Sequence, residues 1–137
     1  MTTMIITAAA LVLALLVACG AASPGPPRPA DGPGDPKIGQ QLFFKTQEMT
    51  GAPTCSTCHT LETEEPAIVG PNLSGVALRA RVRVPGQSAE AYLRESMLDP
   101  SAHVVEGYQQ GIMVRNYADY LTPQQINDLV AFLLTLE

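Results

Sequence analysis

Five consecutive residues, Cys55-Ser56-Thr57-Cys58-His59, constrain this chain more than any other stretch. Two cysteines three positions apart, followed at once by a histidine, have the spacing for covalent attachment of a c-type haem. Residues i and i+3 share one face of a helical turn, so both sulfurs can reach one edge of a porphyrin while the imidazole lies beneath the iron. The sequence therefore predicts one covalent haem c, bound by Cys55, Cys58 and His59.

The same pair of cysteines is also compatible with a thioredoxin-like dithiol or with half of a zinc site. Zinc would need two further ligands, but no second cysteine pair follows, and the only other histidine is His103. A redox dithiol normally begins a helix that follows a strand, and no strand-like run precedes Cys55. These alternatives stay open, and haem attachment is the interpretation that the motif favours.

Length and composition predict one compact domain that a large cofactor helps to complete. The chain has 137 residues, no Trp, four Tyr and three Phe, which indicates a modest core. Its formal net charge is −5, with only eight Lys and Arg. A nucleic-acid binder would show a basic stripe, so this class is disfavoured.

The N-terminus has the pattern of an export signal. Residues 4–18 are apolar except for Thr7 and carry no charge. This length suits the apolar region of a secretory signal, but it is shorter than the ~20 apolar residues that a membrane-spanning helix needs. Leu16-Val17-Ala18-Cys19 then resembles the lipobox of bacterial lipoproteins. The resemblance implies a signal peptide over residues 1–18 and lipid attachment at Cys19, on the outer, periplasmic or extracytoplasmic face of the bacterial cytoplasmic membrane.

Two alternatives for the N-terminus stay open, because Met1-Thr2-Thr3 lacks the usual Lys or Arg. The segment could remain as a short uncleaved anchor, or Cys19 could be incidental. With two thiols used by haem and one by lipid, no cysteine is left for a disulfide. Residues 19–35 are predicted to form a tether, because residues 20–36 hold six of the twelve prolines and could extend ~50 Å at ~3.1 Å per residue.

The remaining chain, residues 36–137, reads as helical. Asp35-Pro36 predicts the start of a helix through Leu42 and Phe43, and Gly39 within it suggests that another helix packs closely there. Residues 88–98 predict a second helix that ends at Asp99-Pro100. No sustained alternation of apolar and polar residues indicates a sheet.

The C-terminal helix is the most strongly marked element. Thr122-Pro123-Gln124-Gln125 has the form of a capping box with proline at the first helical position. An amphipathic stripe follows, formed by Ile126, Leu129, Val130, Leu133 and Leu136.

Together these features resemble a class I monohaem cytochrome c over residues 36–137. The motifs that carry the resemblance are Gly39 and Phe43, the Cys55–His59 motif, Gly70-Pro71-Asn72-Leu73, a late methionine and Asp128-Leu129-Val130-Ala131-Phe132-Leu133. The resemblance implies an all-α fold whose first and last helices cross, with Gly39 and Phe43 packed against Phe132 and Leu133. It also implies that the Pro71 carbonyl accepts a hydrogen bond from the second nitrogen of the His59 imidazole.

The sixth iron ligand has three candidates. Met113 lies in a loop with Gly107 and Gly111, before the last helix, where the resemblance places the ligand methionine; the family's proline after that methionine is Val114 here. Met97 falls four residues after Leu93, as an ordinary core residue would. His103 is most simply a solvated loop histidine, and Met49 precedes the haem motif. Met113 is the predicted ligand.

Three arginines and two tyrosines are further candidates for contact with the haem. Arg79, Arg81 and Arg83 alternate, so an extended segment would place them on one side, facing a haem propionate, an acidic partner or only solvent. Tyr108 and Tyr117, close to Met113, are predicted either as walls of the haem pocket or as ordinary core residues.

His59 and Met113 ligation predicts low-spin iron with no open position, hence a one-electron carrier and not an enzyme. The partners expected are a membrane oxidoreductase complex or a soluble redox carrier. The lipid-type cysteine, tether and Gly-Tyr-x-x-Gly-x-Met loop also resemble monohaem subunits of respiratory complexes, such as alternative complex III and the cytochrome c domains of haem-copper oxidases. The alternative function is a five-coordinate haem protein with peroxidase or sensing activity, which requires Met113 to be absent from the iron.

Overall fold

A computed structural model describes residues 32–44, 51, 53–115 and 117–137. The predicted signal peptide, the lipid site at Cys19, the tether up to residue 31, and Met49 lie outside these described residues.

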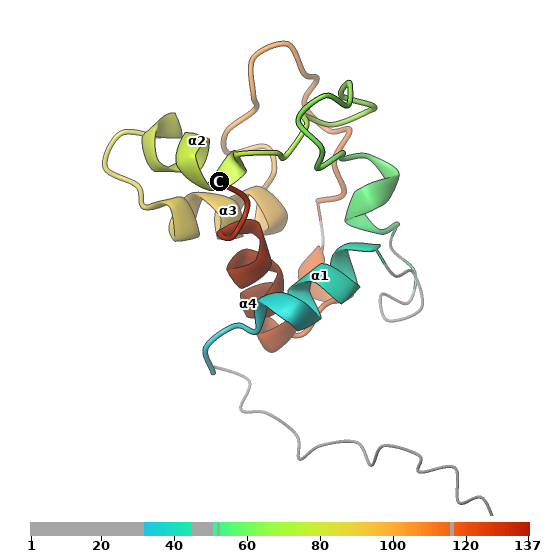
Figure 1. Ribbon diagram of the computed structural model, residues 1–137, viewed down its shortest axis with the longest axis vertical. Coiled ribbons are helices and arrows are strands. Elements are labelled where there is room, and N and C mark those ends of the chain that lie inside the picture. The colour runs from blue at the N-terminus through green and yellow to red at the C-terminus, as the bar shows by residue number, and fades with distance from the viewer. Residues whose placement is uncertain (1–31, 45–50, 52, 116) are drawn as a thin grey trace, which may run out of the picture.

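The described part of the chain contains four α-helices and two short 3₁₀ turns, joined by loops (Figure 1). The helices are α1 (Pro36–Phe44), α2 (Val76–Arg83), α3 (Ala89–Leu98) and α4 (Pro123–Leu133), and the turns are η2 (Cys55–Thr57) and η3 (Tyr117–Asp119). No strand occurs among the described residues, so the predicted all-α fold is confirmed. In the same residues, no helix has both the length and the apolar character to cross a membrane.

The first and last helices cross and form the most extensive contact between elements, as predicted (Figure 1). Helix α1 begins where the Asp35 carboxylate accepts hydrogen bonds from the backbone N–H groups of Lys37 and Ile38. A Cβ atom at Gly39 would overlap the backbone carbonyl of Asp128 on α4. Only glycine therefore permits the two backbones to approach this closely.

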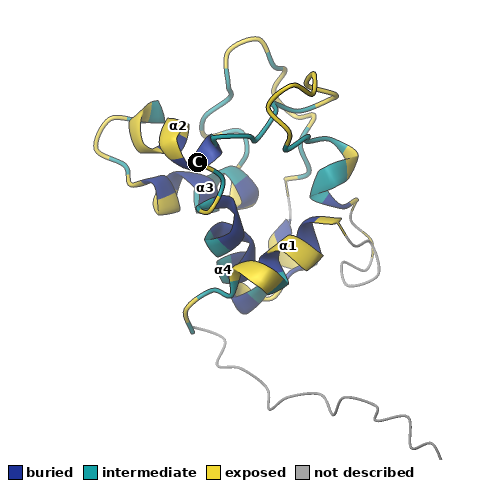
Figure 2. Ribbon diagram, viewed as in Figure 1, coloured by how far each residue is buried: buried dark blue, intermediate teal, exposed yellow. Residues whose placement is uncertain are grey.

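Helix α4 starts as its sequence predicts. The Thr122 hydroxyl accepts a hydrogen bond from the Gln125 backbone N–H, and the Gln125 side chain accepts one from the Thr122 N–H, which completes the capping box. Ile126, Leu129, Val130 and Leu133 are buried. They belong to the core together with Phe43 and Phe132, whose rings meet edge to face with centroids 5.6 Å apart. In Figure 2 most of α4 and part of α1 have the colour of buried residues.

The segment with three alternating arginines is a helix, so the prediction that an extended stretch places Arg79, Arg81 and Arg83 on one side is wrong. On α2 they diverge: Arg79 and Arg83, four residues apart, line the cavity described below, whereas Arg81 pairs with Glu137 at 3.1 Å. The helix escaped prediction because its N-cap is Gly75, in a left-handed conformation (φ 63°), with no side-chain cap.

Helix α3 matches its predicted bounds. The Ser88 hydroxyl accepts a hydrogen bond from the Ala91 N–H at 3.1 Å, and the helix ends before Asp99-Pro100. Tyr92, Leu93 and Met97 form its buried face.

Residues 32–35, just before α1, lie against α4. The Gln124 amide donates to the Pro33 carbonyl (3.1 Å) and the Asn127 amide donates to the Gly32 carbonyl (2.9 Å). The Asp35 backbone N–H donates to the Asp128 carboxylate at 2.8 Å. Hydrogen bonds from α4 thus hold the chain that enters α1.

Candidate functional site

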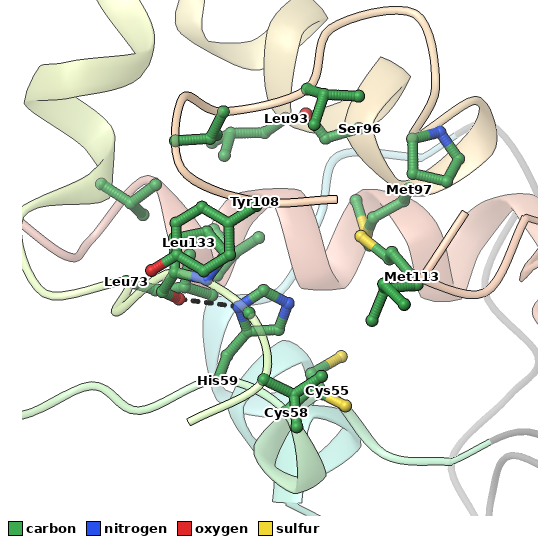
Figure 3. Close-up of a pocket in the computed structure, with 18 of the residues that line it drawn as sticks. Cys55, Cys58, His59, Leu73, Leu93, Ser96, Met97, Tyr108, Met113 and Leu133 are labelled. Atoms are coloured by element: carbon green, nitrogen blue, oxygen red, sulfur yellow. Dashed lines mark hydrogen bonds between the residues drawn. The ribbon is translucent and has the colours of Figure 1, made fainter. Parts of the chain in front are cut away.

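Both cysteines of the motif lie on one short turn. Turn η2 is closed by hydrogen bonds from the Cys58 and His59 backbone N–H groups to the Cys55 carbonyl, at 3.1 and 2.9 Å. In a 3₁₀ turn residues i and i+3 are eclipsed, so the two side chains extend to the same side. Figure 3 shows both sulfur atoms beside each other, below the His59 ring.

The His59 imidazole is fixed by a backbone acceptor. Its Nδ1 lies 2.8 Å from the Pro71 carbonyl oxygen, and because a carbonyl only accepts, Nδ1 carries the proton (Figure 3). Burial lowers the pKa of His59, with the Pro71 hydrogen bond opposing this in part. The ring is therefore neutral near pH 7, with the lone pair on Nε2, the nitrogen that a metal can bind.

Gly70 leaves room for the His59 ring. A Cβ atom there would overlap the His59 imidazole. The Gly70 N–H donates to the Cys58 carbonyl at 2.9 Å, and the Leu73 N–H donates to the Thr60 carbonyl at 2.8 Å. These bonds hold residues 70–73 alongside the end of the cysteine motif, where a side chain at position 70 would displace the ring.

A mainly apolar cavity opens above the motif. Its walls come from η2, the 69–73 segment, α2, α3, the 100–114 loop and α4, and they include Leu73, Val76, Leu93, Tyr92, Val105, Tyr108, Tyr117 and Leu133. Tyr117 is buried, and its hydroxyl donates to the Pro53 carbonyl at 3.1 Å. Both tyrosines named from the sequence therefore line the cavity, and Tyr117 also belongs to the core.

All three candidates for the second axial position line this cavity. Figure 3 shows two of them, Met97 and Met113. Met97 is 5% exposed, on the buried face of α3. Met113 is partly buried in the loop before α4 and packs against the core. His103 is partly buried, with its ring edge to face against Tyr92 at 5.7 Å, so it is less solvated than the sequence suggested.

The residues around the cavity fit a haem of the c type. Two adjacent thiols, one neutral imidazole with its lone pair on Nε2, and thioethers on the facing loop and helix surround an apolar space. Burial raises the pKa of the Cys55 thiol to about 11, which is the opposite of the lowered values of reactive cysteines. Among the described residues, no three His, Cys, Asp or Glu side chains are grouped to hold a metal ion.

Asn72 and Arg79 were both named from the sequence, but their role in holding the loop next to this site was missed. Asn72 and Arg79 make hydrogen bonds throughout the 62–74 segment, which carries the Pro71 carbonyl. The signal was present in Gly70-Pro71-Asn72-Leu73, but the partners of Asn72 are set by the path of the loop, which the motif alone does not specify.

The family comparison agrees with this geometry. The family model described as Cytochrome c matches residues 36–137. Comparison with curated protein sequences gives no match. Among solved structures, the chain is similar to one from the crystal structure of SoxXA from P. pantotrophus, with 26% identity and a TM-score of 0.44, over 77% of this chain and 84% of that chain. The family match covers most of the chain, and with the cysteine-histidine turn and its cavity it shows that the chain belongs to the cytochrome c family, which carries electrons on a covalently bound haem c.

Proposed function

We propose that the protein is a class I monohaem cytochrome c that transfers single electrons, with thioether bonds at Cys55 and Cys58 and with His59 and Met113 as axial ligands. The observation that carries this proposal is the hydrogen bond from His59 Nδ1 to the Pro71 carbonyl. It leaves Nε2 as the coordinating nitrogen in a cavity that Met113 also lines. Donation to a carbonyl also increases the basicity of the imidazole as a ligand.

Met113 is favoured over Met97 and His103 by its surroundings. Met97 contributes to the buried face of α3, and its role in the core accounts for it. His103 packs against Tyr92. Met113 lies two residues after Gly111, which has a φ of 83°, and outside any helix, so its side chain is not committed to a helix face.

The haem supplies an iron that changes between the ferric and ferrous states. The Met113 thioether, a soft and weak donor, would favour the ferrous state and raise the potential, while the His59 imidazole opposes this. Apolar residues of α3 and α4 line the cavity and would limit the access of water to the two ligands. With both axial positions filled by protein, the iron would have no site for a substrate.

We further propose a membrane-tethered arrangement for the domain. Its support is the sequence: a signal peptide at 1–18, a lipid-accepting Cys19, a Pro- and Gly-rich tether predicted over 19–35 and a cytochrome domain over 36–137. The last residues of that predicted tether, 32–35, are hydrogen-bonded to α4 and so belong with the folded domain. The protein would lie at the periplasmic or extracytoplasmic face of the membrane. There it would exchange electrons with a membrane oxidoreductase complex, as a subunit or a free carrier, or with a soluble redox protein.

One spectroscopic experiment tests the axial ligands. The oxidised full-length protein should show the weak far-red band of methionine bound to ferric haem, and the reduced protein should not bind CO readily. A missing far-red band together with rapid CO or cyanide binding would instead indicate the five-coordinate haem protein with peroxidase or sensing activity. A pyridine haemochrome assay, with the intact mass, reports the covalent haem and the lipid.

A further inference from the structure

The side chain of Asn72 connects three parts of the loop that follows the haem motif. Its Nδ2 donates to the backbone carbonyls of Glu62 and Glu65, both at 2.8 Å. Its Oδ1 accepts from the Ser74 N–H at 2.7 Å. Both amide protons and the oxygen are thus engaged, and the 62–65 segment is held against the turn at residues 71–74.

Arg79 holds the same turn from the other side. From helix α2, its Nη2 donates to the Asn72 carbonyl at 2.8 Å and its Nη1 donates to the Ser74 carbonyl. A planar guanidinium presents its donors in a fixed fork, which suits two carbonyls close together. The turn is therefore fixed in two ways: the Asn72 side chain binds the 62–65 segment, and Arg79 of α2 binds the backbone carbonyls of the turn.

Pro71 directly precedes Asn72, and its carbonyl is the acceptor for His59 Nδ1. We propose that Asn72 and Arg79 are positioning residues for His59: by fixing the turn at 71–74 they hold the Pro71 carbonyl within hydrogen-bond distance of Nδ1, and so set the orientation and donor strength of the imidazole. The inference rests on the part of the proposed function that makes His59 an iron ligand. It does not depend on which residue occupies the opposite axial position.

The physical link is the sensitivity of a ligand histidine to its second hydrogen bond. An imidazole that donates strongly through Nδ1 gives more electron density to the metal and stabilises the ferric state. If the turn loosens, the Nδ1 bond lengthens, the imidazole becomes a weaker donor and the reduction potential rises. The Nδ1 proton also exchanges faster with water, because its bond opens more often.

Three variants and a control test this in the full-length, haem-loaded protein. Asn72→Asp keeps the acceptor for Ser74 but loses both donors, and Arg79→Gln loses the fork. Arg79→Lys is the milder change, because an ammonium group keeps the charge without the planar fork. The control is Arg81→Gln, which removes the same charge from the same helix but affects only an exposed pair with Glu137.

The readouts are exchange of the His59 Nδ1 proton, followed by NMR in the reduced protein, and the reduction potential, both measured where every variant is folded. We expect exchange to be about tenfold faster in Asn72→Asp and Arg79→Gln, which is the effect of losing roughly one hydrogen bond. The potential of Arg79→Gln should rise relative to Arg81→Gln, which has lost the same charge. The added carboxylate of Asn72→Asp lowers the potential by itself, so for that variant the exchange rate is the readout. The exchange rate and the potential of Arg79→Lys should lie between those of the wild type and Arg79→Gln. Those of Arg81→Gln should equal the wild-type values.

The outcomes distinguish failure of the positioning role of Asn72 and Arg79 from failure of the proposed ligation by His59 and Met113. Unchanged exchange and potential in Arg79→Gln and Arg79→Lys would overturn the positioning role, whereas a far-red band in the same samples would leave His59 and Met113 ligation standing. Equal shifts in Arg81→Gln would also overturn it, because charge alone would then explain them. If the wild type lacks the far-red band, the Met113 assignment fails, and the exchange rate still decides the positioning role.

Discussion

Gly39 of α1 lies directly against the backbone carbonyl of Asp128 on α4, so close that a Cβ atom at position 39 would overlap it. This contact sets the distance between the two helices whose crossing forms the base of the domain (Figure 1). Several core residues, including Phe43 and Phe132, meet around it.

Gly39→Ala should therefore destabilise the protein by about 2 kcal/mol, because the helices must move apart. Helix propensity alone predicts the opposite sign, since alanine is favoured over glycine by up to ~1 kcal/mol in a helix. Urea unfolding of the haem-loaded protein distinguishes the two, with Gln40→Ala on the exposed face of α1 as control. A Gly39→Ala variant more stable than the wild type would contradict the close contact.

Asp128→Ala should lower the free energy of unfolding by about 2–3 kcal/mol, because it removes a buried acceptor of the hydrogen bonds from the Asp35 N–H and the Gln124 amide. The carboxylate is fully buried and accepts from the Asp35 N–H at 2.8 Å and the Gln124 amide at 3.0 Å. Thermal or urea unfolding measures the loss. Glu64→Ala, on an exposed loop, should change stability by less than ~0.5 kcal/mol; an equal effect at both positions would argue against a specific role for Asp128.

Gly70→Ala should disturb haem ligation more than folding. The added methyl group overlaps the His59 ring and would turn it away from the Pro71 carbonyl. We expect a shifted Soret band and a lower yield of haem-loaded protein, measured by absorption and by the pyridine haemochrome. Ala67→Ser, on the exposed part of the same loop, should leave both unchanged. A wild-type spectrum in Gly70→Ala would show that the ring can shift without cost.

The matched pair Met113→Leu and Met97→Leu decides between the two thioethers that line the cavity. Each change preserves apolar volume and removes the sulfur. We expect Met113→Leu to lose the far-red band, bind CO and have a lower potential, because the thioether that favours ferrous iron is gone. Met97→Leu should keep the band at a stability cost below ~1.5 kcal/mol. The reverse pattern would make Met97 the ligand.

Cys19→Ala tests the proposed attachment to the membrane. If Cys19 carries lipid, the wild type should sediment with membranes and require detergent for release, whereas the variant should not. Cell fractionation with haem staining provides the measurement. Sedimentation of Cys19→Ala with membranes would favour an uncleaved N-terminal anchor.

The helices that could be predicted from the sequence are those that begin at a capping side chain close by in the sequence. Helix α1 begins at Asp35-Pro36, α3 at Ser88 and α4 at the Thr122 capping box, and each signal acts within four residues. Helix α2 lacks such a signal: its cap is a glycine, and the alternation of Arg79, Arg81 and Arg83 imitates a strand. Burial of Val76, Ala77 and Ala80 against the rest of the fold decides its conformation.

The candidate site likewise has a part that the local sequence predicts and a part that depends on the fold. The turn that carries Cys55, Cys58 and His59 is local, so the motif was sufficient to predict it. The bonds of Asn72 to residues seven and ten positions earlier, and of Arg79 to the turn, depend on how the loop returns to α2. The sequence offered three candidates for the opposite axial position, and the fold brings all of them to the cavity wall.

The hydrogen bonds from α4 to Gly32 and Pro33 have a practical meaning for shortened versions of the protein. Truncation at Pro36 would remove one acceptor from each of two amide side chains, those of Gln124 and Asn127, and the residue whose N–H donates to Asp128. Expression of the haem domain alone should therefore retain residues from 32 onward. Any tag or flexible spacer added upstream would then leave the molecule beside α4, away from the loops that line the cavity (Figure 1).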